Sequence, residues 1–469
     1  EVRRLSGISS QLNGEAKEVL SEIQYRGDNQ LTARTFGNGL VDSRGYDLQG
    51  RLTQQGLSNP TEMIDSRAYR YDRNGNVLAI DTSGEDNSYG YDGLDRLITG
   101  TEGTDTDTYQ YDANDNRLEK TSDTDSTVLS YLPDSNRLIR ESTLYASDAP
   151  GVPATREYSY NAAGRLYQLI EEDILKAEYV YNDAGQRTRK TVYGADGVSI
   201  ASITVYHYDQ MGYLVTETDD QGRLIKDYIW QEGMSPLAQI DNDGGTETLT
   251  YLHTDHLMTA RLATDETGVI IWRWDGEAFG NTEAQEITGI SINLRFPGQY
   301  YDSETNLHYN WNRYYDPSIG RYVTSDPMGL EGGINTYGYV QANPSRYVDL
   351  LGLKITGRWL EEFTGSASAG INHIQLIDFE VRILPPAVSL AKILVGGRGS
   401  ASGKIRCEET DECGDVVRVW ELGASVSVED TATFHVPISP LPWYIGIAIT
   451  LGLNIYEASQ YLQFLTSLE

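Results

Sequence analysis

The chain has 469 residues, of which 37 are basic and 69 acidic, so its formal net charge is −32. This charge repels nucleic-acid backbones and anionic membrane surfaces, and it excludes nucleic acid as an expected partner of the repeat-rich scaffold. The length allows two or three domains, and the presence of only two cysteines, Cys407 and Cys413, excludes a disulfide framework.

A tyrosine-rich motif recurs through the first half of the chain. YRYDRNGNVL begins at Tyr69, YGYDGLDRL at Tyr89 and YQYDANDNRL at Tyr109. The second tyrosines of four successive copies are evenly spaced, at Tyr71, Tyr91, Tyr111 and Tyr131. A fixed period of this length predicts stacked supersecondary units.

Each copy is predicted to form one β-hairpin. Tyrosines at alternate positions share one face of a strand, the Asp, Asn and Gly residues that follow favour a turn, and Arg-Leu restarts the strand. Stacked hairpins would bury tyrosine rings with their hydroxyls on polar partners, so that 33 tyrosines replace an aliphatic core. The alternative is that the tyrosine stripes bind sugars or peptides, but their regular period favours the structural interpretation.

The composition changes sharply after the block Arg295–Leu353. This block contains two similar segments, SDPMGL and VDLLGL, and it precedes the tail 354–469. The tail has Gly/Ala/Ser patches and Ile/Leu/Val runs in place of the Tyr-Asp repeats. Such a boundary indicates a processing junction between a scaffold and a cargo.

FGNGL (Phe36–Leu40), the segment Tyr251–Asn281 and the block Arg295–Leu353 look like successive landmarks of one family. At these motifs and the repeats, the sequence resembles the Rhs/YD-repeat family, to which the C components of bacterial ABC toxins and the teneurins are related. The resemblance implies a mostly β protein, in which a spiralling β-hairpin YD-repeat shell is closed by an Rhs core domain and followed by a small α+β C-terminal domain. The implied boundaries are 1–285 for the shell, 286–353 for the core and 354–469 for the variable, toxin-like domain.

The resemblance also implies that the core cleaves its own chain. Asp326 and Asp349 match the catalytic acids of the family, and the scissile bond then joins Leu353 to Lys354. Two carboxyls that share a proton can hydrolyse a peptide, because proximity separates their pKa values so that one activates water and the other protonates the leaving amine. The segment between the two acids contains Gly and Asn-Pro turn formers, which allow the chain to fold back.

Arg321 is the predicted support of this dyad, because a guanidinium can hold one carboxylate ionised or bind a developing oxyanion. Leu350 stands where the family has proline, and the loss of a fixed φ is expected to slow cleavage without removing an acid. The alternative is that both acids only cap turns, as Asp before Pro commonly does.

The scaffold offers no strong metal motif. His253, Asp255 and His256 in HTDH have a metal-like composition but lack a third clustered ligand of the usual kind. Acidic turns such as DRNGN lack the Glu that closes a calcium loop. We therefore expect neither a metal nor a cofactor.

The tail is less informative. Short alternating stretches in its first half predict strands. The uncharged run Leu441–Leu453 is too short to cross a bilayer as one helix, so it predicts a buried helix, with membrane insertion after release as the alternative. His373 and His435 could serve a hydrolytic site, although isolated histidines are more often structural. Cys407 and Cys413 predict free thiols or one disulfide.

Two classes of function fit these observations. In the first, the chain is an Rhs-type toxin carrier that encloses and releases a C-terminal effector used against competing or host cells. In the second, it is a YD-repeat cell-surface or adhesion protein without catalysis.

Because the chain starts at Glu1 without an apolar leader, we expect it to be a piece of a longer protein. The first class implies a preceding shell or plug region, or a separate B-like shell partner, with the C-terminal domain as encapsulated cargo. It further implies a cognate immunity protein, secretion machinery, and export from a bacterium as a secreted or cell-surface effector.

Overall fold

The computed structural model describes residues 5–353 apart from 29, 85, 133–134, 146–155 and 232–233, together with the backbone of seven strands between 364 and 451. The chain divides into two units, Glu1–Ile355 and Thr356–Glu469. None of the helices in the described residues is long and apolar enough to cross a membrane.

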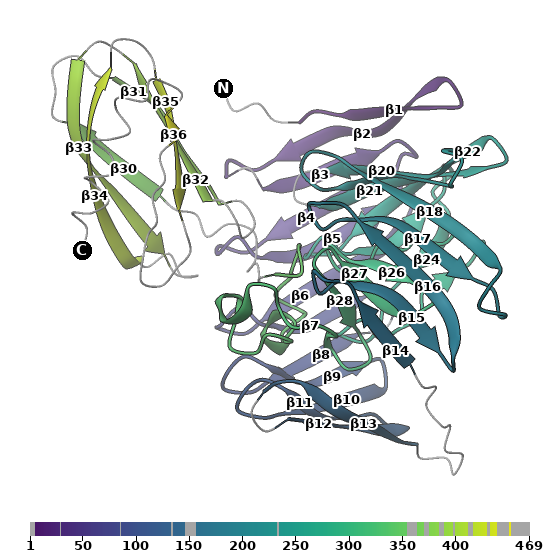
Figure 1. Cartoon of the computed structure of the whole chain (residues 1–469). Coiled ribbons are helices and arrows are strands. Elements are labelled where there is room, and N and C mark those ends of the chain that lie inside the picture. Colours follow the sequence, from purple (N-terminus) through teal and green to yellow (C-terminus); the bar gives the residue numbers. More distant parts are fainter. Residues whose placement is uncertain are drawn as a thin grey trace. The chain divides into compact units, whose positions relative to one another are not determined.

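Two large antiparallel sheets make up most of the first unit (Figure 1). In both sheets, every strand pairs with the next one along the chain. The first sheet has 13 strands, namely β1 Ile8–Leu12, β2 Glu15–Tyr25, β3 Leu31–Phe36, β4 Val41–Tyr46, β5 Leu52–Ser58, β6 Met63–Tyr71, β7 Val77–Thr82, β8 Asn87–Tyr91, β9 Leu97–Glu102, β10 Asp105–Tyr111, β11 Arg117–Thr121, β12 Asp125–Tyr131 and β13 Leu138–Tyr145.

The second sheet continues the same meander with 12 strands. They are β14 Arg156–Tyr160, β15 Leu166–Glu171, β16 Ile174–Tyr181, β17 Arg187–Tyr193, β18 Ile200–Tyr208, β19 Leu214–Thr218, β20 Leu224–Gln231, β21 Ser235–Asp243, β22 Thr246–Thr254, β23 Ala260–Thr264, β24 Ile270–Arg273 and β25 Gln285–Glu286. One apolar cluster contains Leu20 and Phe36 of the first sheet together with Leu237 and Tyr251 of the second, so the two sheets pack on each other there.

The tyrosines stack as the repeat period predicted. The first tyrosine of a copy is buried, as at Tyr69 and Tyr109, which are 4% and 3% exposed. The second tyrosine donates its hydroxyl hydrogen to a backbone carbonyl of the preceding hairpin, as from Tyr91 to Val77 at 2.7 Å and from Tyr111 to Leu97 at 2.8 Å. The mostly β fold and the hairpin repeats are therefore confirmed.

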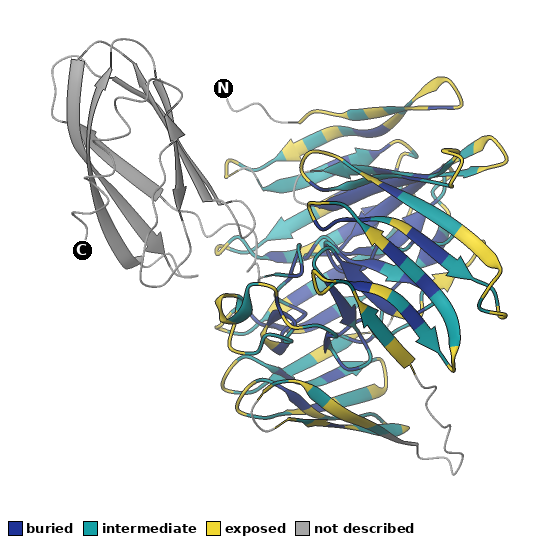
Figure 2. Ribbon diagram, in the orientation of Figure 1, coloured by how far each residue is buried: buried dark blue, intermediate teal, exposed yellow. Residues whose placement is uncertain are grey.

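Along the chain, a small third sheet follows the repeats and precedes the end of the first unit. It has four strands, β26 Tyr300–Asp302, β27 Leu307–Asn310, β28 Arg313–Asp316 and β29 Arg321–Tyr322, and is followed by two 3-10 helices, η1 Gly329–Gly332 and η2 Val340–Ala342. The strands of this sheet are among the most buried of the described residues (Figure 2).

Buried side chains tie this small sheet to the repeats. Arg187 of β17 donates hydrogen bonds to the carboxylate of Asp302 in β26, and both side chains are 0% exposed. Tyr315 and Tyr322 of the small sheet pack with Trp272 and Trp274 in one aromatic cluster. The core region is therefore held firmly against the second sheet.

The described residues of the second unit form strands, as their alternating patterns predicted. They are β30 Thr364–Ala369, β31 Gln375–Ile383, β32 Ser389–Gly396, β33 Gly399–Thr410, β34 Val416–Val428, β35 Ala432–Ile438 and β36 Thr450–Leu451. Their order is β30-β33-β34 in one sheet and β31-β32-β35-β36 in another. Thr450 pairs with His435 as a strand inside the segment predicted as a helix, and the rest of Leu441–Leu453 lies outside the described residues, as do His373 and Cys413.

Candidate functional site

The two predicted acids lie on loops that leave the small sheet. Asp326 comes shortly after β29 and before η1, and Asp349 follows η2. Both residues are buried, with 5% and 2% of their surface exposed. One oxygen of each carboxylate caps a turn: Asp326 Oδ1 accepts the backbone N–H of Met328 at 2.8 Å, and Asp349 Oδ1 accepts that of Leu353 at 3.1 Å.

The other two carboxylate oxygens meet at one guanidinium. Nη2 of Arg313 lies 3.0 Å from Asp326 Oδ2 and 3.1 Å from Asp349 Oδ2. The remaining nitrogens of Arg313 hold it in place, because Nε donates to the carbonyl of Gly352 and Nη1 to that of Thr336 at 3.1 Å. A guanidinium that is itself held in this way fixes the positions of both carboxylates.

A tyrosine and an asparagine complete the environment of Asp349. The hydroxyl of Tyr322 donates to Asp349 Oδ2 at 2.8 Å. Nδ2 of Asn310 donates to the Tyr322 hydroxyl and to the backbone carbonyl of Asp349, both at 2.8 Å. The ring of Tyr322 also lies 3.6 Å beneath the guanidinium of Arg313. All of these side chains are buried, so they form a polar network that is shielded from solvent.

The predicted scissile carbonyl lies beside the first acid. A methyl group placed on Gly332 would lie 2.4 Å from Asp326 Oδ2 and 2.9 Å from the carbonyl oxygen of Leu353. The carboxyl of Asp326 and the carbonyl of Leu353 therefore face the same narrow gap, which only a glycine leaves open. Lys354, on the other side of the predicted bond, lies outside the described residues.

Electrostatics distinguish Asp326 from an ordinary carboxyl. Burial raises the pKa of Asp326, Arg313 opposes this shift, and the charge of Asp349 adds to it. Burial also raises the pKa of Tyr322 well above its ordinary value, and the charge of Asp349 adds to the shift. Tyr322 therefore keeps its hydrogen and acts as a donor to Asp349.

The structure places Arg321 elsewhere. Its guanidinium donates to the backbone carbonyl of Asn136 and to Asn116 Oδ1, and it lies over the rings of Tyr131 and Tyr337. The prediction that Arg321 supports the acids is therefore corrected: Arg313 does so. Arg321 lies in β29, where it pairs with Asp316 of β28. Its side chain contacts Asn116 and Asn136 and so links the core to the first sheet.

Sequence reasoning missed Arg313, Tyr322 and Asn310, because no motif marks them. The signal lies in strand register: Asn310 pairs with Arg313 across β27 and β28, which puts both beside the loop that carries Asp349. Only the register of the folded sheet brings these residues together.

Leu350 is held by packing. It is 4% exposed and clusters with Met234, Leu257 and Val348. A methyl group on Gly298 would lie 2.1 Å from the Leu350 carbonyl oxygen, so the two backbones are in close contact. The residue after Asp349 is therefore fixed by tertiary contacts, although it lacks the ring of a proline.

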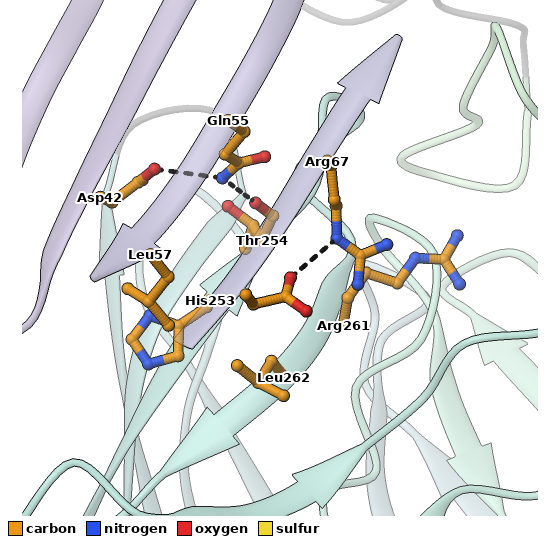
Figure 3. A pocket seen from close by; sticks show the side chains of 9 residues that line it. Asp42, Gln55, Leu57, Arg67, His253, Thr254, Arg261 and Leu262 are labelled. Carbon is orange, nitrogen blue, oxygen red and sulfur yellow. Dashed lines mark hydrogen bonds and ion pairs between the residues drawn. The ribbon is translucent and has the colours of Figure 1, made fainter. Parts of the chain in front are cut away.

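His253 and Thr254 of the HTDH segment lie between the two large sheets, and the carbonyl of Thr254 accepts a hydrogen bond from Gln55 of the first sheet (Figure 3). His253 lies 2.9 Å from Thr264 Oγ1, and burial lowers its pKa to about 3, so it is neutral. Asp255 pairs with Arg261 at 2.8 Å, and His256 Nε2 lies 2.8 Å from the carbonyl of Ser345. Among the described residues, no group of three or more His, Cys, Asp or Glu side chains is arranged to hold a metal ion.

The cavity beside His253 is small. It measures about 20 Å³ and is lined by charged residues of both sheets, among them Asp42, Arg67 and Arg261. This volume has room for little more than a water molecule, since one water needs about 10–15 Å³ on this measure. The cavity therefore belongs to the ion-pair network between the sheets.

Several bacterial toxins are similar to this chain in sequence. The toxin protein Tse5 of Pseudomonas aeruginosa is 26% identical over 78% of this chain and 24% of its own length. The probable deoxyribonuclease RhsB of Dickeya dadantii is 29% identical over 68% of this chain and 23% of its own length. The double-stranded DNA deaminase toxin A of Burkholderia cenocepacia is 31% identical over 44% of this chain and 16% of its own length. The chain thus spans about a quarter or less of the length of these relatives.

Solved structures show the same fold. The TcdB2–TccC3 structure matches 75% of this chain and 20% of its own with a TM-score of 0.63 at 21% identity. The Tc holotoxin pore of Photorhabdus luminescens matches the same shares with a TM-score of 0.63 at 20% identity. The family model described as the teneurin YD-shell matches residues 82–344. This match covers more than half of the residues of the chain, and it confirms the resemblance to Rhs/YD-repeat proteins. The chain therefore belongs to the teneurin YD-shell family.

Proposed function

We propose that the core is a self-cleaving protease in which Asp326 and Asp349 cut the bond between Leu353 and Lys354. The observation that supports this most directly is the convergence of both buried carboxylates on Nη2 of Arg313, at 3.0 and 3.1 Å, next to the backbone of Leu353. The charge of Asp349 adds to the raised pKa of Asp326, and neighbouring carboxyls with different pKa values can act as acid and base.

The environments of the two acids support a different role for each. Burial raises the pKa of Asp326, which supports the role of proton donor for this acid. Asp349 accepts hydrogen bonds from Arg313, Tyr322 and Leu353, which is the pattern of a carboxylate acting as base.

In the cleavage step, Asp349 takes a proton from water as the water oxygen bonds to the carbonyl carbon of Leu353. Asp326 gives its proton to the amide nitrogen of Lys354 as the carbon–nitrogen bond breaks. The products are a carboxyl group at Leu353 and a free amine at Lys354. Asp326 and the Leu353 carbonyl face the same gap beside Gly332, which supports Asp326 as the proton donor.

Leu350 is compatible with this activity. In the family resemblance a proline follows the second acid, and its fixed φ would stiffen the approach to the bond. Here the burial of Leu350 against Gly298, Met234 and Leu257 supplies a comparable restraint through packing. We therefore expect cleavage to proceed with leucine at this position.

Within a longer protein, this chain would act as part of a toxin carrier. The matched portion covers a quarter or less of each toxin to which this chain is similar. The YD-shell model matches residues 82–344 of this chain. The C-terminal unit would be the cargo released by the cut, for use against competing or host cells. Partners of the intact protein would be further shell or plug segments or a B-like shell protein, secretion machinery and a cognate immunity protein, and its destination would be outside the producing bacterium.

The proposal is tested by denaturing mass analysis of the purified chain and of Asp326→Asn and Asp349→Asn. We expect the wild-type chain to yield a fragment that begins at Lys354. In each variant the rate of cleavage should fall about 10²–10⁴-fold, the usual contribution of general acid–base catalysis. Asparagine suits this test because its side-chain oxygen can still accept the backbone hydrogen bond that caps each turn.

Glu331→Gln is the matched control, since Glu331 is an exposed acid in η1 close to the site, and it should cleave like wild type. A wild-type chain that stays at full length under all conditions would leave both acids as turn caps, and would support the alternative of a YD-repeat cell-surface protein without catalysis.

A further inference from the structure

The loop between the two acids is bound to the turns of the first sheet. Asn335 of this loop donates a hydrogen bond from Nδ2 to Oδ1 of Asn116 at 3.0 Å. Further along the loop, Asn343 donates from Nδ2 to Oδ1 of Asn76 at 2.9 Å. Asn76 and Asn116 end equivalent turns of two repeats, with one repeat between them. The loop is therefore held at two fixed points of the repeat array.

Asparagine gives these two turns an acceptor that the turn between them lacks. In that turn Arg96 occupies the equivalent position, and its Nε donates to Oδ2 of Asp92 at 2.8 Å. Asn116 binds its own turn in the same way, because its Nδ2 donates to Oδ2 of Asp112 at 2.9 Å. A guanidinium has donors only, whereas an amide also carries an oxygen. This oxygen is the group that receives the loop, and both Asn116 and Asn76 are buried.

The first of these points lies beside Asp326. Oδ1 of Asn335 caps a turn by accepting the backbone N–H of Tyr337 at 3.0 Å. The carbonyl of Thr336, the residue after Asn335, accepts the backbone N–H of Asp326 at 2.7 Å and Nη1 of Arg313 at 3.1 Å. The bridge to Asn116 therefore fixes the carbonyl that holds one acid and the shared arginine.

The second point leads to Asp349. The carbonyl of Asn343 accepts the backbone N–H of Tyr347 at 3.2 Å, which closes the turn before this acid. Oδ1 of Asn343 accepts the hydroxyl of Ser345 at 3.1 Å, and the hydroxyl oxygens of Ser345 and Tyr91 are 2.7 Å apart. Tyr91 is the second tyrosine of a repeat. The segment that carries Asp349 is therefore attached to the first sheet as well.

We propose that Asn76 and Asn116 are positioning residues for the cleavage proposed above, because they fix both ends of the loop and so set the separation of Asp326 and Asp349. This inference rests on the proposed function and adds a condition for it. The acid pair is complete only when the core loop is docked on the folded repeats of the first sheet. A displacement of about 1 Å at a reacting group can cost about 10²-fold in rate, so cleavage depends on this docking.

The first test breaks one bridge from the side of the loop. Asn335→Asp keeps the oxygen that caps the turn but replaces the donor by an oxygen that faces Oδ1 of Asn116. We expect the fragment that begins at Lys354 to appear about tenfold more slowly, the equivalent of about one hydrogen bond. The thermal midpoint should change little, because Asn335 is only half-buried. Asn161→Asp, in a repeat turn of the second sheet that Oδ1 also caps, is the matched control and should cleave like wild type.

The second test separates position from stability. Asn116→Asp keeps an oxygen for Asn335 and Arg321, but it loses the donor to Asp112 and places two carboxylates side by side. Its thermal midpoint should fall, while the folded chain cleaves at close to the wild-type rate. Asn116→Leu has a similar volume and no acceptor, so it should slow cleavage about tenfold. A merely structural role would make the rates of both variants follow their thermal midpoints.

Wild-type rates in both Asn335→Asp and Asn116→Leu would overturn the inference and leave the proposed protease standing. The inference is also wrong if Asn116→Asp cleaves as slowly as Asn116→Leu at a temperature at which both chains are folded. A wild-type chain that does not cleave would remove the proposed function and this inference with it. The wild-type chain alone therefore distinguishes the two failures.

Discussion

The turns of the repeats and the loops of the core use the same local motif for different ends. In the repeat turn at Asp92, Oδ1 accepts the backbone N–H of Arg96, four residues on, and Oδ2 binds the side chain of Arg96. Asp349 likewise accepts the N–H of Leu353, four residues on, but its Oδ2 turns to Arg313 and Tyr322. The cap is the same, and the partner of the second oxygen differs.

This difference changes the electrostatics. Burial opposes ionisation of Asp92, but the hydrogen bonds from Arg96 and the turn backbone outweigh it and lower its pKa. At Asp326 burial dominates and raises the pKa, and the charge of Asp349 adds to the shift. Arg96 also pairs with two acids, Asp92 and Asp115, but both are partly exposed and the turn is structural. The two acids that share Arg313 are buried, and this makes them a candidate acid–base pair.

The largest effect is expected from replacing the shared arginine. Arg313→Lys keeps the charge but loses the fork that reaches both carboxylates and two carbonyls, so cleavage should fall on the order of 10³-fold. The rate at which the Lys354 fragment appears measures this. Arg96→Lys is the matched change in a repeat turn and should leave cleavage unaltered. Equal rates for the two variants would contradict the distinction between the regions.

A smaller effect is expected at Gly332. Alanine there would place its methyl group 2.4 Å from Asp326 Oδ2, which forces the carboxyl away from the Leu353 carbonyl. A displacement of about 1 Å should slow cleavage about 10²-fold, while the thermal midpoint of unfolding changes little. Gly93→Ala, in a repeat turn with nothing within 4 Å of the added methyl, is the control. Normal cleavage by Gly332→Ala would show that this close approach has no part in the reaction.

The smallest effect concerns stability and belongs to the repeats. Burial raises the pKa of Glu102 to about 8, and the charges of Glu277 and Asp107 add to the shift. The folded chain therefore holds a proton that the unfolded chain releases near pH 4.5, so stability declines as pH rises from there through about 8. The thermal midpoint should fall across this window, and Glu102→Gln should flatten its pH dependence. Glu62→Gln, an exposed acid, should behave like wild type, and an unchanged slope in Glu102→Gln would refute the assignment.

The sequence alone determined the repeat architecture. The even spacing of the paired tyrosines and the Asp/Asn/Gly turns between them specify hairpins through contacts between residues close in the chain, and such contacts depend on the local sequence. Local motifs also singled out Asp326 and Asp349 as candidate acids, and their catalytic role stays a prediction.

Only the tertiary structure decided which groups surround those acids. Arg313, Tyr322 and Asn310 come from three different strands, and the register of the small sheet aims them at Asp349. Arg321, which the motif favoured, is turned toward Asn116 and Asn136 of the repeats. A convergence of side chains from separate elements depends on packing and register, and these have no local signature in the sequence.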